Sequence, residues 1–212
     1  MFLLLTLLGF FSGSILYSAL LPRLIKGVDV RSLAPDHNPG AANAFKYGGT
    51  GVGIAALACD LLKAYLPVRL AFELLGADTP GFALVLCAPV LGHAFSPFAH
   101  FHGGKAIAAS FGALLALLPG YHVVFHLAFW YILFSSLVLI RPHAVRTILT
   151  FTLTALYALA QPVRSIAWGV VMICLTVCWR HFPSLHSSPF SLRILGLRLW
   201  PVGHKEENCS AE

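Results

Sequence analysis

Residues 50–72 read TGVGIAALACDLLKAYLPVRLAF, and this stretch decides the class of fold. A helix needs about 20 mostly apolar residues to cross the hydrocarbon core of a bilayer, and this stretch supplies them. Two charged side chains, Asp60 and Lys63, lie near its middle. They are three residues apart, so they share one helix face and can form an ion pair. The pair either only neutralises itself or also supports a polar cavity beneath a neighbouring loop, and both interpretations stay open at this point.

The composition of the whole chain agrees with a membrane protein. Of its 212 residues, 58% are hydrophobic and only 10% are charged. Ordinary soluble domains have about 25% charged residues. A chain of this length cannot bury so much apolar surface in its own core, so the remainder must face lipid. These values exclude a disordered chain, a nucleic-acid-binding domain and an ordinary soluble enzyme, and we interpret the five cysteines as small apolar residues.

Further apolar stretches flank this segment on both sides. The first has no basic residues before it and no clear cleavage site, so we expect a retained helix rather than a signal peptide. We predict an all-α integral membrane protein with seven transmembrane helices, at residues 2–21, 50–72, 80–98, 106–120, 123–140, 147–162 and 165–179. Six crossings are the alternative, if a piece near Pro119 or Pro162 is bent or re-entrant.

The positions of the basic residues indicate the orientation. With the N-terminus outside, eleven of the fourteen Lys and Arg residues fall on the cytoplasmic side, as the positive-inside rule requires. The C-terminus is then cytoplasmic. We expect one transmembrane domain over residues 1–182 and a polar cytoplasmic tail over residues 183–212, partly disordered.

The first predicted cytoplasmic loop is rich in turn-forming and polar residues. It contains Asp36-His37-Asn38-Pro-Gly40 and Asn43, between the basic residues Arg31 and Lys46. Asn, Asp, Pro and Gly at this density make tight turns. Backbone N–H groups and amides in such turns, beside basic side chains, suit a phosphate. An ordinary polar turn is the alternative interpretation.

The second cytoplasmic loop ends in Gly103-Gly104-Lys105, directly before an apolar stretch. The glycines let the backbone approach a ligand closely, and the start of a helix favours an anion. A nucleotide P-loop is excluded, because the preceding strand and the GxxxxGK[ST] spacing are absent. A flexible turn with a snorkelling lysine is the alternative.

Histidines 93, 100 and 102 in the same loop have no carboxylate or cysteine near them in sequence and lack the spacing of a helical metal pair. We therefore predict no metal site and no cofactor. His93, next to a glycine, is better interpreted as a hydrogen-bonding or acid–base group. The chain contains no Gly-x-Ser-x-Gly elbow and no evident Cys–His pair, so a covalent acyl-enzyme has no candidate nucleophile.

These features together resemble the PlsY family, the bacterial membrane acyl-phosphate:glycerol-3-phosphate acyltransferases. No single motif is specific, but the ordered set is. It comprises Gly13-Ser14-Ile15, Lys26-Gly-Val-Asp-Val-Arg31, Asn38-Pro-Gly-Ala-Ala-Asn43, Asp60-Leu-Leu-Lys63, Gly92-His93-x-Phe-x-Pro97, Phe101-x-Gly103-Gly104-Lys105, Gly112 and Arg180-His181.

The resemblance implies a multi-pass enzyme of the bacterial inner membrane whose active site faces the cytoplasm. It would transfer a fatty acyl group from acyl phosphate to the 1-position of glycerol 3-phosphate, giving lysophosphatidic acid for phospholipid synthesis. It implies no metal, no covalent intermediate and a monomer. The implied catalytic residues are His93, Lys105 and Asn38; the implied substrate- and phosphate-binding residues are Arg31, Asn43, Lys46, Gly103, Gly104, Arg180 and His181; the implied supporting residues are Ser14, Asp60 and Lys63.

The chain departs from the family pattern at two motifs. The first motif lacks its serine, and Asp36 or His37 stands nearby as a replacement. The third motif lacks an Asn and a second Arg after Arg180-His181, and Ser184 stands where the Asn is expected. Two alternatives therefore accompany the enzyme hypothesis: a small multi-span transporter or lipid-binding protein, and a catalytically inactive relative.

Overall fold

The computed structural model describes residues 1–194 and 197–200 of the chain. Most of these residues are helical, and a small sheet lies near the C-terminal end. The helices are α1 (Phe2–Ser14), α2 (Tyr17–Lys26), α3 (Val30–Leu33), α4 (Ala41–Gly48), α5 (Thr50–Leu75), α6 (Phe82–Ala94), α7 (Ile107–Leu115), α8 (Val123–Ile132), α9 (His143–Leu159) and α10 (Arg164–His181). Short helical turns η1 (Pro97–Ala99), η2 (Leu133–Leu137) and η3 (Phe182–Ser184) and the strands β1 (Val138–Arg141), β2 (Ser191–Ile194) and β3 (Leu197–Trp200) complete the described elements.

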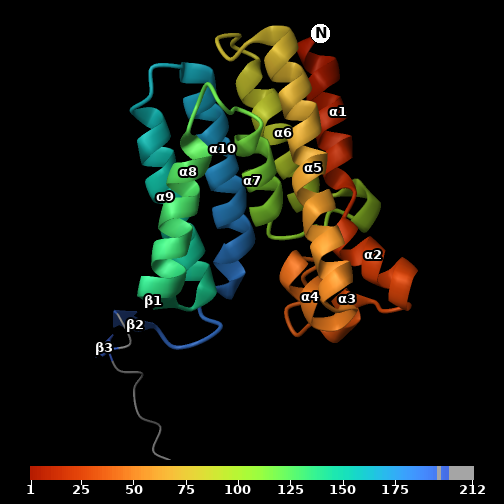
Figure 1. The fold of residues 1–212 in the computed structure, drawn as a ribbon, viewed down its shortest axis with the longest axis vertical. Coiled ribbons are helices and arrows are strands. Elements are labelled where there is room, and N and C mark those ends of the chain that lie inside the picture. Colours follow the sequence, from red (N-terminus) through yellow and green to blue (C-terminus); the bar gives the residue numbers. More distant parts are fainter. Residues whose placement is uncertain (195–196, 201–212) are drawn as a thin grey trace, which may run out of the picture.

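The longer helices lie side by side in one bundle (Figure 1). Helix α6 packs against both α1 and α10, α10 packs against α9, and α5 packs against α7. Helices α2, α3 and α4 gather at the end of the bundle opposite the N-terminus, and the strands lie at that same end (Figure 1). The loops that carry the candidate phosphate-binding residues therefore meet at one end of the molecule.

Helix α5 shows why the bundle is a membrane structure. Leu62, Leu66 and Leu70, spaced four residues apart on one face, are each about half exposed. Asp60 and Lys63, in the same helix, are buried in the bundle. This arrangement is the reverse of a soluble helix, which exposes its charges and buries its leucines. The exposed leucine stripe therefore faces lipid, and the buried face carries the polar interior.

Small residues allow α1 and α6 to pack closely. A Cβ atom added to Gly13 would lie 2.1 Å from the carbonyl oxygen of Pro89, and one added to Gly92 would lie 2.0 Å from that of Phe10. Membrane helices associate through such small-residue contacts, because lipid provides no hydrophobic force between them. This contact fixes α6, whose C-terminal end carries His93.

Three helices, those containing α5, α6 and α10, are long and apolar enough to cross a membrane among the described residues. A fourth candidate is the pair α1 and α2, which bends by 42°. The span predicted over residues 2–21 is therefore broken near Ile15 and Leu16 rather than straight. Helices α7, α8 and α9 are shorter than the 18 residues of a simple crossing.

The prediction of an all-helical fold is wrong at β1, β2 and β3, which form an antiparallel sheet in the order β1-β2-β3. Residues 138–140, predicted as the end of the helix over 123–140, belong to strand β1. Strands β2 and β3 lie in the predicted tail. In the β1–β2 pair, Ile140 lies opposite Leu192 and Leu139 opposite Arg193. Distant segments supply the pairing, which local sequence patterns cannot reveal. The last part of the predicted tail, residues 201–212, lies outside the described residues.

Candidate active site

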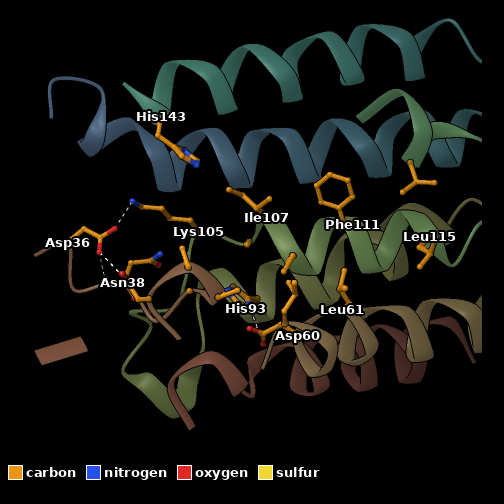
Figure 2. Close-up of a pocket in the computed structure, with 18 residues that line it drawn as sticks. Asp36, Asn38, Asp60, Leu61, His93, Lys105, Ile107, Phe111, Leu115 and His143 are labelled. Carbon is orange, nitrogen blue, oxygen red and sulfur yellow. Dashed lines mark hydrogen bonds and ion pairs between the residues drawn. The ribbon is translucent and has the colours of Figure 1, made fainter. Parts of the chain in front are cut away.

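A cavity of about 680 Å³ lies between α5, α7 and the segment around α4. Asp36, Asn38 and Lys105 line its polar end, and Phe111 and Leu115 lie in its apolar part. Figure 2 shows this progression from the polar side chains at one end, past His93 and Asp60, to the apolar side chains at the other. The cavity therefore suits a molecule with a polar head and an apolar chain.

A second, smaller cavity of about 290 Å³ adjoins the polar end of the first. Asp36, Asn38 and Lys105 line both cavities, and Arg180 and Ser184 line only the second. The second cavity accordingly offers a guanidinium, an ammonium, an amide and a hydroxyl to a small polar molecule. A ligand in each cavity would meet the other beside Lys105.

Lys105 is paired with Asp36 where the cavities meet. The Lys105 Nζ atom lies 2.8 Å from Asp36 Oδ2, and Asn43 donates a hydrogen bond of 3.1 Å to Asp36 Oδ1. Partial burial raises the pKa of the Asp36 carboxyl, but the hydrogen bonds from Lys105 and Asn43 outweigh this effect and hold the pKa below its usual value. Asp36 is thus a carboxylate at neutral pH and a poor general base.

Asn43 and Asn38 are linked in the same loop. Asn43 Nδ2 donates a hydrogen bond of 2.8 Å to the Asn38 carbonyl oxygen. The side-chain oxygen Asn38 Oδ1 is buried and has no hydrogen-bond partner among the described residues. A buried acceptor without a partner is costly, and the residue that carries it lines both cavities.

Helix α7 begins two residues after Lys105, at Ile107, with Ala106 in the left-handed backbone conformation as its N-cap. The first N–H groups of an α-helix have no partner within the helix, and the helix dipole favours negative charge there. Residues 105–108 line the first cavity. The start of α7 and the Lys105 ammonium therefore present a positive potential to the same space, as the sequence led us to expect.

The glycines before Lys105 act differently from the prediction. The N–H of Gly103 donates to the carbonyl of Ala94, and that of Gly104 donates to the carbonyl of His93. The expectation that these two N–H groups face a phosphate is therefore wrong, because the fold already uses both. Their small size is what the loop requires: a Cβ atom on Gly104 would lie 2.2 Å from His93 Nε2.

Arg180 holds this loop from the other side. Its guanidinium donates hydrogen bonds to the carbonyl oxygens of Gly104, at 3.2 Å, and of Gly103, at 2.6 Å. Arg180 comes from the end of α10 and lines the second cavity. It therefore joins the Gly103-Gly104 loop to the last helix while its charge remains beside the small polar cavity.

A buried polar network supports the floor of the first cavity. Lys63 Nζ lies 2.7 Å from Asp60 Oδ1 and 2.8 Å from His93 Nδ1, and Ser18 donates a hydrogen bond to Asp60. Asp60 and His93 line the cavity. Of the two interpretations of the Asp60–Lys63 pair, the structure supports the one in which it underlies a polar cavity.

The same network defines the state of His93. An ammonium group can only donate hydrogen bonds, so His93 Nδ1 accepts from Lys63 and the ring hydrogen resides on Nε2. Nδ1 is thereby engaged as an acceptor for Lys63, while Nε2–H is a donor for which the described residues supply no partner. His93 is therefore a hydrogen-bonding and orienting group in this state rather than a general base.

Several predicted site residues lie outside both cavities. Arg31 donates a hydrogen bond of 3.0 Å to the carbonyl of His102, and His37 Nδ1 lies 2.9 Å from the carbonyl oxygen of Arg31. Lys46 is exposed, with its ammonium 5.0 Å from the centre of the Tyr47 ring. Ser14 is buried and donates to the carbonyl of Phe10 in its own helix. These residues shape or surround the loops.

His143 is a polar cavity residue that was not predicted, because no motif in the sequence contains it. It lies at the start of α9 and lines the first cavity. His181, a predicted substrate-binding residue, is buried beside it, with nearly parallel rings 6.1 Å apart. Among residues 1–194 and 197–200, no group of three or more His, Cys, Asp or Glu side chains is placed to hold a metal ion.

A family model described as glycerol-3-phosphate acyltransferase matches residues 3–187. The chain belongs to this family. The glycerol-3-phosphate acyltransferase of Vibrio campbellii is 30% identical over 187 residues, which cover 86% of this chain and 87% of that protein. The glycerol-3-phosphate acyltransferase of Vibrio vulnificus is 30% identical over 184 residues, covering 85% of each chain. The predicted PlsY resemblance is thereby confirmed.

A solved structure of the glycerol-3-phosphate acyltransferase family shares the fold. The crystal structure of PlsY (YgiH), an integral membrane glycerol 3-phosphate acyltransferase, in its glycerol 3-phosphate form, aligns with a TM-score of 0.76 and 24% sequence identity. The alignment covers 87% of this chain and 90% of that one. The helices described above thus have the arrangement of an integral membrane protein, and the transporter alternative is not favoured.

Proposed function

We propose that this member of the glycerol-3-phosphate acyltransferase family transfers a fatty acyl group from acyl phosphate to the 1-hydroxyl of glycerol 3-phosphate. The observation that carries the proposal is the meeting of a long, partly apolar cavity and a small polar cavity at Lys105. Acyl phosphate has an apolar chain and a phosphate head, whereas glycerol 3-phosphate is small and polar. Each cavity matches the chemistry of one substrate.

The donor occupies the first cavity in this proposal. Its acyl chain lies along α7, against Ile107, Phe111 and Leu115. Its phosphate lies at Lys105 and the start of α7, where an ammonium group and a helix N-terminus favour an anion. The carbonyl carbon then lies near the junction of the two cavities.

The acceptor occupies the second cavity, with its phosphate toward Arg180 and Ser184. Its hydroxyl donates a hydrogen bond to Asn38 Oδ1, the buried acceptor that has no partner among the described residues. Ser184, which stands in place of the family's Asn, thus contributes a hydroxyl to this cavity. Asp36 fixes Lys105 and the loop before Asn38 rather than acting on the substrate as a base.

The transfer is direct in this proposal. The acceptor oxygen attacks the acyl carbonyl carbon and forms the ester bond, the bond between the acyl carbon and the phosphate oxygen breaks, and the hydroxyl proton leaves with the released phosphate. Ser184 is the only Ser, Thr or Cys among the described residues that line either cavity, and it lies away from the donor. Positioning of the two substrates and stabilisation of negative charge by Lys105 supply the catalysis.

We further propose seven crossings of the bacterial inner membrane, with the N-terminus outside and the active site cytoplasmic. Helix α7, the continuous segment of α8 and η2, and helix α9 each pack beside a longer helix and serve as the short crossings. The basic loops and both cavities then face the cytoplasm. The functional unit in this proposal is a monomer.

The test is phosphate release by purified protein supplied with acyl phosphate, with and without glycerol 3-phosphate. We expect release that depends on both substrates, with formation of lysophosphatidic acid. Lys105→Ala should lower kcat/KM by about 100-fold or more, because it removes a cation from developing negative charge. Lys26→Ala, at an exposed position on α2 outside both cavities, is the matched control. Folded wild-type protein without acceptor-dependent release would refute the proposed function.

A further inference from the structure

The first cavity contains a polar side chain that the proposed reaction leaves without a role, His143. It projects from the start of α9 toward the cavity, on the opposite side of Lys105 from Asn38 (Figure 2). It is exposed, and it lines the cavity. A histidine at this position either has no role in binding or contacts a ligand in the cavity.

The orientation of the His143 ring is fixed at one nitrogen. His143 Nδ1 lies 3.1 Å from Thr147 Oγ1, and Tyr131 Oη lies 3.1 Å from the same oxygen. Thr147 in turn donates a hydrogen bond of 3.0 Å to the His143 carbonyl. A hydroxyl oxygen can donate one hydrogen bond and accept two, so Nδ1–H and the Tyr131 hydroxyl complete its set. The other ring nitrogen, Nε2, is left for a ligand.

The plane of the His143 ring is also fixed, by packing against the His181 ring. The His143 and His181 rings are nearly parallel, with an interplanar angle of 8° and centroids 6.1 Å apart. His181 is itself held by a contact of 2.8 Å between its Nδ1 and the carbonyl oxygen of Val177. His181 Nε2 is buried and has no hydrogen-bond partner among the described residues. Such preorganisation is typical of a binding group rather than of a freely moving surface side chain.

We propose that His143 Nε2 is a binding group for the phosphate of the acyl donor, opposite Lys105 across the polar end of the first cavity. This inference rests on the proposed function, which places that phosphate there. When phosphate is bound, Nε2–H donates a hydrogen bond to a phosphate oxygen, while Nδ1–H keeps its hydrogen bond to Thr147. The charged groups around the ring are Lys105 on the opposite wall, Arg146 on the same helix, and Asp36 in the first loop. Lys105 and His143 then hold the donor phosphate from two sides.

The test separates the two substrates. His143→Ala should raise KM for acyl phosphate about tenfold, because one hydrogen bond to a charged group is lost. It should leave KM for glycerol 3-phosphate unchanged. His143→Gln, which retains an N–H donor near the position of Nε2, should recover part of the loss. His122→Ala is the matched control, because His122 is exposed before α8 and lines neither cavity.

Calorimetric binding of inorganic phosphate, the second product, keeps the inference separate from the proposed function. Wild-type protein should bind phosphate more tightly than His143→Ala. Normal turnover with an unchanged KM for acyl phosphate in His143→Ala would overturn the inference and leave the function intact. Equal increases in both KM values would also overturn it. A third outcome separates the two proposals. If the wild type shows no turnover but still binds phosphate more tightly than His143→Ala does, the proposed function fails and the anion-binding role of His143 stands.

Discussion

At the scale of single residues, the site depends on which polar groups are already paired. Lys105 is paired with Asp36, and His93 Nδ1 accepts a hydrogen bond from Lys63. In contrast, Asn38 Oδ1 is buried without a partner among the described residues. The sequence left His93 open as a hydrogen-bonding or acid–base group and predicted phosphate binding by the glycines. The pairing pattern favours an orienting role for His93 and leaves Asn38 Oδ1 as the acceptor that the proposed function uses.

The Asp36–Lys105 pair leads to a prediction about affinity. A donor phosphate must compete with the Asp36 carboxylate for the Lys105 ammonium. Asp36→Asn should therefore lower KM for acyl phosphate, by up to about fivefold, since partly exposed ion pairs contribute up to about 1 kcal/mol. Initial rates at varied acyl phosphate would measure this change. Asp78→Asn, at an exposed position outside both cavities, is the control, and a raised KM in Asp36→Asn would contradict competition.

The same pair sets the direction of a pH effect on stability. The folded-state pKa of Asp36 lies below its ordinary value, so the ionised carboxylate stabilises the fold. This contribution is fully present above the ordinary aspartate pKa of about 3.9 and is lost as pH falls through the lower folded value. The side chain is 42% exposed, so solvent weakens the effect.

At the scale of secondary-structure elements, close helix contacts hold the site together. Helix α6 carries His93 and packs against α1. Arg180 from α10 donates a hydrogen bond to the carbonyl of Gly103, in the loop after α6. The positions of the cavity residues therefore depend on how closely α1 and α6 approach. Small residues where α1 and α6 contact each other determine this close approach more than the apolar character of the neighbouring side chains does.

Gly13→Ala tests this contact. The new methyl group would lie 2.1 Å from the Pro89 carbonyl oxygen, so the helices must separate, at a cost of about 1–3 kcal/mol. We expect a lower thermal midpoint in detergent and reduced turnover. Gly51→Ala on α5 adds the same methyl group where no neighbouring atom lies within 4 Å, so its midpoint should not fall. Equal midpoints for the two variants would contradict tight α1–α6 packing.

At the scale of the whole molecule, the bundle has one polar end. The first loop, Lys105 and the end of α10 meet there, at the two cavities. A reaction between a membrane-soluble donor and a water-soluble acceptor requires such a place, where an apolar cavity and a polar cavity meet.

The proposed orientation predicts the location of individual loops. Alkaline phosphatase, which is active only outside the cytoplasm, should be active when fused after Asp78, in the loop between α5 and α6. It should be inactive when fused after Gly104. Green fluorescent protein at these two positions should give the opposite pattern in intact cells. Active phosphatase at Gly104 would refute the cytoplasmic active site.

The sequence by itself determined the membrane class, the family and most helix positions, because apolar periodicity and ordered motifs are local properties of the chain. It also pointed to the residues that line the cavities at their polar end, Asp36, Asn38, Lys105 and Arg180. Only the tertiary structure decided which polar atoms are paired, that β1 pairs with β2, and that His143 lines the cavity. Each of these outcomes depends on contacts between segments far apart in sequence, which no local pattern records.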